Sequence, residues 1–173
     1  CRGTFEHPIV IRGDRFDCIN DVDQTPYNQM PNQWGGIYLQ NSQSHHVIEN
    51  THIYSAGVGV LLVGANRSEP TLELRNSVVH NSGAYGVYAQ QGNLVVENSE
   101  ISNCGESCIA QLGGTLRMAH VTVANYYRYA SRKNASVRIL NYVTQNGVRL
   151  TFPVTSAIIE NSIIFGGNSE ELE

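Results

Sequence analysis

The chain has four aspartates, which all fall within ten residues, at Asp14, Asp17, Asp21 and Asp23. Proteins bind Ca²⁺ with about six to eight oxygen ligands, and these carboxylates, with Asn20 beside them, could supply several. The segment lacks the central glycine and the terminal glutamate of an EF-hand loop. Aspartate also favours turns, so solvated turn-forming carboxylates are the alternative. We expect no tight calcium site, and Ca²⁺ is the only cofactor that these residues suggest.

Three aromatic residues could hold a sugar by stacking. Side chains alternate along a strand, which places Tyr38 and Tyr88 in one outward column with Leu61 between them, and Trp34 at the start of the same face. Exposed aromatic and aliphatic surface of this kind can stack on sugar rings. The aspartate-rich loop or another segment could instead cover it. Trp34, Tyr38 and Tyr88 are therefore the candidate ligand-binding residues.

No pair of acids or bases accompanies these aromatic residues. A pectate-lyase-like reaction needs carboxylates for calcium and a base for the sugar proton, and a glycosidase needs two carboxyls about 5–9.5 Å apart. The other outward positions of the same strands are not ionisable at neutral pH: Gln40, Val63, Gln90, Ala110 and Leu112. The sequence therefore predicts no catalytic residues in this segment.

Histidines and cysteines do not indicate a metal site either. His45 and His46 are adjacent, so they point to opposite faces of a strand. The other histidines considered belong to different columns: His52, His80 and His120. The cysteines show no zinc-finger spacing: Cys1, Cys18, Cys104 and Cys108. For Cys104 and Cys108, buried free thiols are favoured over a disulfide.

A repeated hexapeptide must position all of these residues. It reads aliphatic, variable, Asn, hydroxyl, variable, aliphatic, and its third position recurs at Asn50, Asn76, Asn98, His120 and Asn161. The separations are 26, 22, 22 and 41 residues, which indicates coils of about 22 residues and one insertion. Each coil holds three short strands, so equivalent residues stack about 4.8 Å apart in columns. The pattern predicts an all-β parallel β-helix of roughly six coils.

Two polar columns are interpreted as structural. Asn tolerates the left-handed backbone of a tight bend, and its amide can pair with an Asn in the next coil. This predicts one amide ladder at Asn50, Asn76, Asn98 and Asn161, and a similar column at the next corner, at Ser55, Asn81, Asn103 and Asn125. A third column alternates in sign and predicts cross-strand ion pairs on a solvated face: Glu49, Arg75 and Glu97.

Two segments depart from the coils. Residues 14–34 are predicted to be a long loop. Residues 131–156 are predicted to be a hairpin arm, because Asn146-Gly147 separates alternating segments at 136–142 and 148–152. Three tyrosines lie at its base, where packing against the coil is favoured over exposure to a ligand: Tyr126, Tyr127 and Tyr129.

Length and composition limit the possible classes of protein. A chain of 173 residues accommodates one domain, here residues 1–173. Lys133 is the single lysine and the arginines are scattered, so nucleic acid is not an expected partner. The sequence contains no apolar run of about 18 residues, so it predicts no membrane span. The repeat is already running near residue 9 and still running at Ile164, so we expect a segment of a longer chain.

The chain resembles right-handed parallel β-helix repeat proteins of the pectin-lyase-like superfamily. More narrowly, it is similar to the cell-surface β-helix lipoproteins of gut Bacteroidetes. The resemblance rests on the segments 8–15 and 27–37, the Asn-Ser-x-Ile repeats and the segment 163–166. It implies a right-handed coil and an exported protein on a bacterial surface, anchored to the outer membrane in its full-length form.

The resemblance does not indicate one function, because similar coils occur in lyases, glycosidases, epimerases and adhesins. The residues favour a non-catalytic binding or structural solenoid with a polysaccharide or oligosaccharide as partner. The alternative is a polysaccharide-active lyase or glycoside hydrolase whose catalytic residues lie outside this segment.

Overall fold

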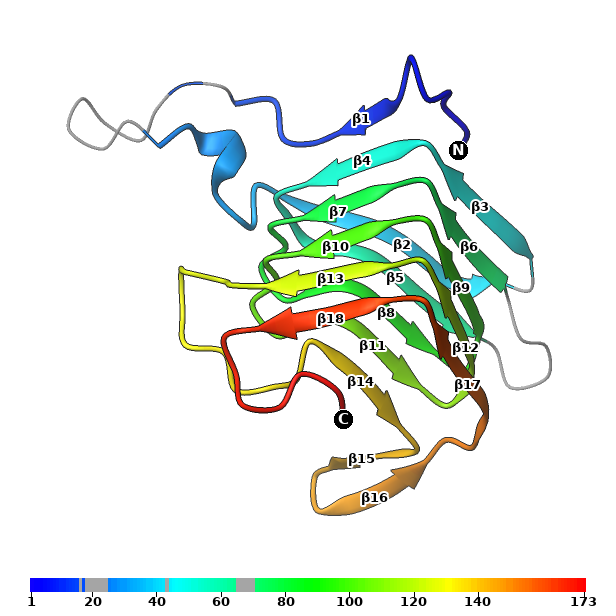
Figure 1. Cartoon of the computed structure of the whole chain (residues 1–173). Coiled ribbons are helices and arrows are strands. Elements are labelled where there is room, and N and C mark those ends of the chain that lie inside the picture. The colour runs from blue at the N-terminus through cyan, green and yellow to red at the C-terminus, as the bar shows by residue number, and fades with distance from the viewer. Residues whose placement is uncertain (16, 18–24, 43, 65–70) are drawn as a thin grey trace.

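The computed structural model describes residues 1–15, 17, 25–42, 44–64 and 71–173, and shows a solenoid of short strands stacked in three parallel sheets (Figure 1). The first-strand sheet holds β2 (Trp34–Ser42), β5 (Ala56–Gly64), β8 (Tyr85–Gln90), β11 (Ser107–Leu112) and β14 (Val137–Leu140). The second-strand sheet holds β3 (His45–Glu49), β6 (Thr71–Arg75), β9 (Asn93–Glu97), β12 (Gly114–Ala119) and β17 (Val154–Glu160). The third-strand sheet holds β1 (Ile9–Ile11), β4 (Thr51–Tyr54), β7 (Val78–His80), β10 (Glu100–Ser102), β13 (Thr122–Asn125) and β18 (Ile163–Gly166).

The strand register confirms the predicted repeat. In the third-strand sheet Ile53 pairs with Val79, Val79 with Ile101, Ile101 with Val123 and Val123 with Ile164. The number of coils is smaller than the roughly six predicted. In the described part of the chain, β2 to β13 supply the strands of four successive coils, and β14, β17 and β18 supply those of a fifth, which the hairpin interrupts. Before them, β1 supplies one strand instead of a whole coil.

The core consists of the predicted aliphatic columns. Ile53, Val79, Ile101 and Val123 are fully buried, and so are Leu74, Val96 and Met118. Each such side chain contributes roughly 1.5–3 kcal/mol, so only the stack of coils offsets the entropy of ordering the chain. Cys104 and Cys108 lie in this core as free thiols, as predicted, and burial raises the pKa of Cys108 well above its usual value.

The asparagine corners have the predicted backbone but not the predicted amide ladder. Asn50, Asn76, Asn98 and Asn161 have φ angles of 46°, 48°, 47° and 48°. The side chains of Asn76, Asn98 and Asn161 are exposed, and none of them hydrogen-bonds to another described residue. The hydroxyl column beside them links the coils instead. The Thr51 N–H donates to Ser77 Oγ and the Ser77 N–H to Ser99 Oγ, each at 3.1 Å.

The second polar column does use its amides. Asn125 Oδ1 accepts from the Cys104 N–H at 3.0 Å, and Asn103 Oδ1 accepts from the Tyr126 N–H at 3.1 Å. Asn81 and Asn125 are buried, unlike the first column. The two columns therefore have different roles, which their similar composition does not reveal.

The hairpin forms at the predicted turn but is shorter than residues 131–156. Strands β15 (Tyr142–Gln145) and β16 (Val148–Thr151) are antiparallel around Asn146 and Gly147, whose φ angles are 50° and 76°. The predicted arm includes Val137–Leu140, but this segment is β14, which pairs in parallel with β11 as part of the solenoid. The aliphatic side chains of Val137–Leu140 extend the core columns, and their burial favours pairing in the solenoid over a place in the arm.

The C-terminal residues fold back onto this last coil, and we call residues 167–173 the C-terminal clasp. The Val137 N–H donates to the Glu171 carbonyl at 3.0 Å, and the Ile139 N–H to the Glu173 carbonyl at 2.8 Å. The Glu171 carboxylate pairs with Arg132, and their side chains are 10% and 4% exposed. Within the described residues, no helix has the length and hydrophobicity to cross a membrane.

Candidate functional site

Trp34 does not belong to the outward aromatic strip. Strand β2 has an irregularity between Gly36 and Ile37, which shifts its register against β5 and reverses the alternation before that point. The Trp34 indole packs against the core and donates to the Tyr54 carbonyl at 2.8 Å. Gly36 makes the irregularity possible, because its φ is 126° and a Cβ there would lie 1.7 Å from the Val58 carbonyl oxygen.

Tyr38 and Tyr88 lie in the predicted column, joined through Leu61, but they differ in exposure. Tyr38 is 52% exposed, and its hydroxyl donates to the Gly35 carbonyl at 3.1 Å. Tyr88 is half-buried against Tyr85, with ring centroids 5.1 Å apart, and burial raises its pKa. Ala110 continues the column but is 3% exposed, flanked by Tyr88 and Arg138. The outward face of the first-strand sheet is thus covered at β11, because the longer side chains of Tyr88 and Arg138 close over Ala110.

The aspartate-rich segment lies only partly within the described residues. Asp17 pairs with Arg15 at 2.8 Å, and the hydrogen bond from this guanidinium lowers the pKa of Asp17. Asp21, Asp23, Asn20 and Cys18 lie outside the described residues. The described residues contain no cluster of three His, Cys, Asp or Glu side chains that could hold a metal.

A groove with a volume of about 460 Å³ lies where the strands of the third-strand sheet end. In Figure 1 these strands point toward one side, where the 3-10 helix η1 (Tyr27–Gln29) and the segment after β13 project. We call it the tyrosine groove. Its floor and walls are formed by Arg12, Tyr54, His80, Gln29, Tyr126 and Tyr129.

The floor of the tyrosine groove is an outward column of the sheet. Tyr54 pairs in register with His80, and His80 with Ser102. Alternation turns these three side chains away from the core, since Ile53, Val79 and Ile101 point into it. Arg12 follows β1, whose Ile11 pairs with Ile53, and so extends the same column.

The walls come from two segments that are far apart in the sequence. Tyr129 Oη donates to the Gln29 carbonyl at 3.0 Å, which joins the 3-10 helix to the segment after β13. The second asparagine column anchors both walls to the coils. Asn81 Nδ2 donates to the Gln29 carbonyl, and Asn103 Oδ1 accepts from the Tyr126 N–H. The walls are therefore held by the scaffold.

The groove offers aromatic faces, neutral hydrogen-bonding groups and the guanidinium groups of Arg12 and Arg128. Tyr126 is 58% exposed, and Tyr129 stacks edge-on with Tyr127 at 5.6 Å. Burial raises the pKa of Tyr54 and lowers the pKa of His80, so both are uncharged at neutral pH. Arg128 lies over the Tyr129 ring. No carboxylate is among the described residues that line the groove, and the arrangement suits stacking and hydrogen bonding.

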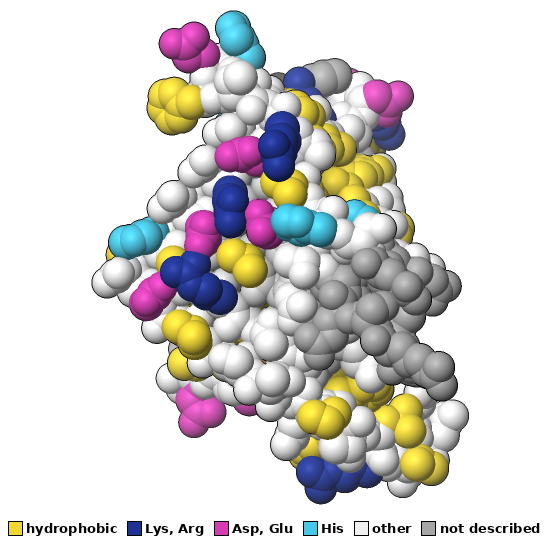
Figure 2. All heavy atoms as spheres, turned by 90° about the vertical axis from the view of Figure 1, so that its right-hand side faces the viewer, with side chains coloured by type: hydrophobic (Ala, Val, Ile, Leu, Met, Phe, Trp, Pro, Cys, Tyr) yellow, Lys and Arg dark blue, Asp and Glu magenta, His cyan; other side chains and the backbone are white. Residues whose placement is uncertain are grey.

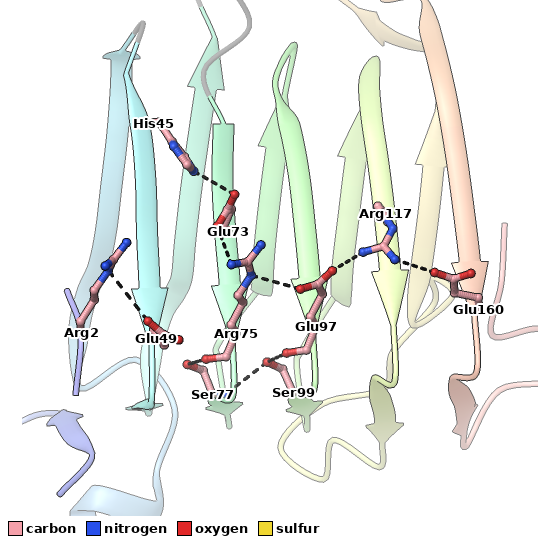
Figure 3. A network of polar contacts seen from close by, with 10 residues as sticks. All are labelled: Arg2, His45, Glu49, Glu73, Arg75, Ser77, Glu97, Ser99, Arg117 and Glu160. Carbon is pink, nitrogen blue, oxygen red and sulfur yellow. Dashed lines mark hydrogen bonds and ion pairs between the residues drawn. The ribbon is translucent and has the colours of Figure 1, made fainter. Parts of the chain in front are cut away.

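The charged residues of the second-strand sheet form a separate network. Figure 2 views this face, where Arg and Glu side chains alternate. Figure 3 shows the pairs, which bridge successive coils: Arg75 with Glu97 at 3.1 Å, Arg117 with Glu97, and Arg117 with Glu160 at 2.7 Å. The predicted cross-strand pairing is confirmed for Arg75 and Glu97. Because these charges neutralise one another, we interpret the network as structural.

Sequence reasoning missed the floor of the tyrosine groove. Arg12, Tyr54 and His80 occupy equivalent positions, one residue after an inward aliphatic residue in three strands. That shared position is a signal the sequence contains. The meeting of Gln29 with Tyr129 is not visible there, because it joins two irregular segments.

Three parallel sheets wound around stacked aliphatic columns define a parallel β-helix. A family model described as a right-handed beta-helix region matches residues 32–170, and the chain belongs to that family. Comparison with curated proteins found no match, and comparison with solved structures found none either.

Proposed function

We propose that this β-helix is a non-catalytic module that binds a glycan chain in the tyrosine groove. The observation that carries the proposal is the convergence of three tyrosines on one walled groove: Tyr54 on its floor, and Tyr126 and Tyr129 at its walls. Aromatic rings stack on the apolar faces of sugars, while nearby polar groups hydrogen-bond to their hydroxyls. The groove replaces the strip of Trp34, Tyr38 and Tyr88 as the proposed site.

The size and composition of the groove support a short oligosaccharide. Ligand sites typically have volumes of about 300–1,000 Å³, and the groove at about 460 Å³ lies in that range. Each stacked ring contributes on the order of 1 kcal/mol, so the dissociation constant should lie at roughly millimolar to tens of micromolar. Such weak binding suits display of many copies, and we propose an exported protein on a bacterial cell surface.

A glycan array with the isolated protein, followed by calorimetry with cellohexaose, xylohexaose and mannohexaose, tests the proposal. Tyr126→Ala should weaken binding about fivefold, and Tyr126→Phe should retain it because the ring remains. Tyr38→Ala is the matched control, since Tyr38 is similarly exposed but lies on the first-strand sheet, outside the groove. Binding that is lost in Tyr38→Ala and kept in Tyr126→Ala would return the site to the first-strand sheet.

The competing function is a polysaccharide-active enzyme. Incubation with acidic and neutral polysaccharides should yield no unsaturated products and no new reducing ends. Turnover that a single carboxylate or histidine substitution abolishes would refute the non-catalytic proposal.

A further inference from the structure

A chain of hydrogen bonds connects His80 to two polar residues of the next coil. His80 Nδ1 lies 2.8 Å from Ser102 Oγ, and Ser102 Oγ donates to Glu100 Oε1 at 2.8 Å. The first contact follows from the register, because His80 and Ser102 are direct partners in β7 and β10. The second joins two outward side chains of β10. Ser102 is 4% exposed, so water does not readily replace either partner.

These two hydrogen bonds determine which ring nitrogen of His80 carries the proton. An ionised carboxylate only accepts hydrogen bonds, and a serine hydroxyl has one proton to donate. Since Ser102 gives that proton to Glu100, its oxygen must accept from His80. Nδ1 of His80 therefore carries the proton, and Nε2 has a free lone pair. Nε2 has no hydrogen-bond partner among the described residues, while the His80 side chain lines the tyrosine groove.

We infer that His80 is a specificity-determining residue of the groove, a neutral imidazole held in its Nδ1–H form so that Nε2 accepts a hydrogen bond from a hydroxyl of the ligand. The inference rests on the proposed function for the nature of the ligand. It predicts that binding of a neutral oligosaccharide weakens when His80 takes up a second proton. Nε2 then becomes a donor, and the acceptor is lost.

The surroundings of His80 include charges of both signs. Arg12 directly follows β1 and Arg128 lies on the wall, while Glu100 accepts the hydrogen bond from Ser102. Tyr54 is 6.3 Å away, centroid to centroid, and bonds through its hydroxyl to His52 Nδ1 at 3.2 Å. Tyr126 and Tyr129 complete the wall. Burial opposes protonation of His80 and only Glu100 favours it, which keeps the ring neutral at pH 7.

Nitrogen NMR of the whole ¹⁵N-labelled chain tests the proton position without any ligand. Long-range correlation spectra should show His80 with a protonated Nδ1 and an unprotonated Nε2, its signals being assigned by their loss in His80→Gln. Ser102→Ala should abolish this preference, whereas His120→Asn, at an exposed corner, should leave it unchanged. A His80 that is protonated at Nε2, or that keeps its form in Ser102→Ala, would overturn the inference.

Binding of xylohexaose and mannohexaose between pH 8 and pH 5 tests the consequence. Affinity should fall roughly threefold to tenfold as pH drops through the pKa of His80 measured in the same spectra, as expected for one lost hydrogen bond. His80→Gln retains an acceptor that does not titrate, so it should bind without this pH dependence. Binding that requires Tyr126 but does not vary with pH would refute the role of His80 alone. Failure of every glycan to bind would refute the proposed function and the ligand role of His80, while the spectra still decide its proton position.

Discussion

Replacing Glu171 by alanine should destabilise the last coil strongly. The Glu171 carboxylate accepts hydrogen bonds from the Ser136 N–H at 2.9 Å and the Asn168 N–H at 2.8 Å, and it pairs with Arg132. Arg132 is 4% exposed, so the substitution leaves a buried guanidinium without its carboxylate. Breaking a buried ion pair on one side costs about 3–5 kcal/mol. Alanine also removes the acceptor for two backbone groups.

Hydrogen exchange is the suitable assay, because the loss is local to one end of a solenoid. The amides of Val137 and Ile139 donate to carbonyls of the C-terminal clasp, so in Glu171→Ala they should exchange about a hundredfold faster or more. Glu173→Gln is the matched control, because the Arg138–Glu173 pair is more exposed and should contribute about 1 kcal/mol or less. Unchanged protection of Val137 and Ile139 in Glu171→Ala would refute the reasoning.

The same carboxylate predicts a dependence on pH. Burial alone raises the pKa of Glu171, but hydrogen bonds from Arg132, Ser136 and the Asn168 N–H outweigh it, and the pKa lies below its usual value. The stabilisation is therefore complete above the unfolded pKa of about 4.3 and is lost as pH falls through the lower folded value. Protection of Val137 should decline over that range in the native chain and show no such decline in Glu171→Gln.

Gly36→Ala should lower the free energy of unfolding by about 2 kcal/mol or more, because its φ of 126° and the nearby Val58 carbonyl exclude a Cβ. Urea unfolding measures this change, and an unchanged midpoint would contradict the close approach of the two backbones. Ser99→Ala should lower the free energy of unfolding by about 1–3 kcal/mol in the same assay, since Ser99 Oγ accepts from the Ser77 N–H and donates to the Glu97 carbonyl. Asn98→Ala should lower it by only about 1–2 kcal/mol, which is the strain of its left-handed backbone. A larger loss of stability in Asn98→Ala than in Ser99→Ala would support the amide ladder instead. Calorimetric titration with Ca²⁺ should give no millimolar or tighter binding; an isotherm that disappears in Asp17→Asn would reverse the interpretation of the aspartates.

Much of the fold could be predicted because the repeat is a local pattern. Alternation along a strand decides which side chains point inward, and a spacing of 22 residues decides which of them stack. The columns of Ile53 and Leu74 follow from these two facts alone. The turn at Asn146-Gly147 is local as well, because both residues tolerate the positive φ that a tight hairpin turn requires. The ion pair between Arg75 and Glu97 could be predicted for the same reason, since register partners are neighbours by construction.

Tertiary structure decided everything that depends on irregular backbone or on unequal burial. The irregularity at Gly36 turns the Trp34 side chain inward, and the sequence pattern alone does not reveal where the alternation of a strand breaks. The Ser77 hydroxyl links two corners by accepting from the Thr51 N–H, whereas the Asn76 amide does not, because Ser77 is buried and Asn76 is exposed. The tyrosine groove exists because Gln29 and Tyr129, 100 residues apart, meet over the sheet. No periodic pattern encodes such a contact, since it arises where two loops leave the repeat and the packed coils bring their ends together.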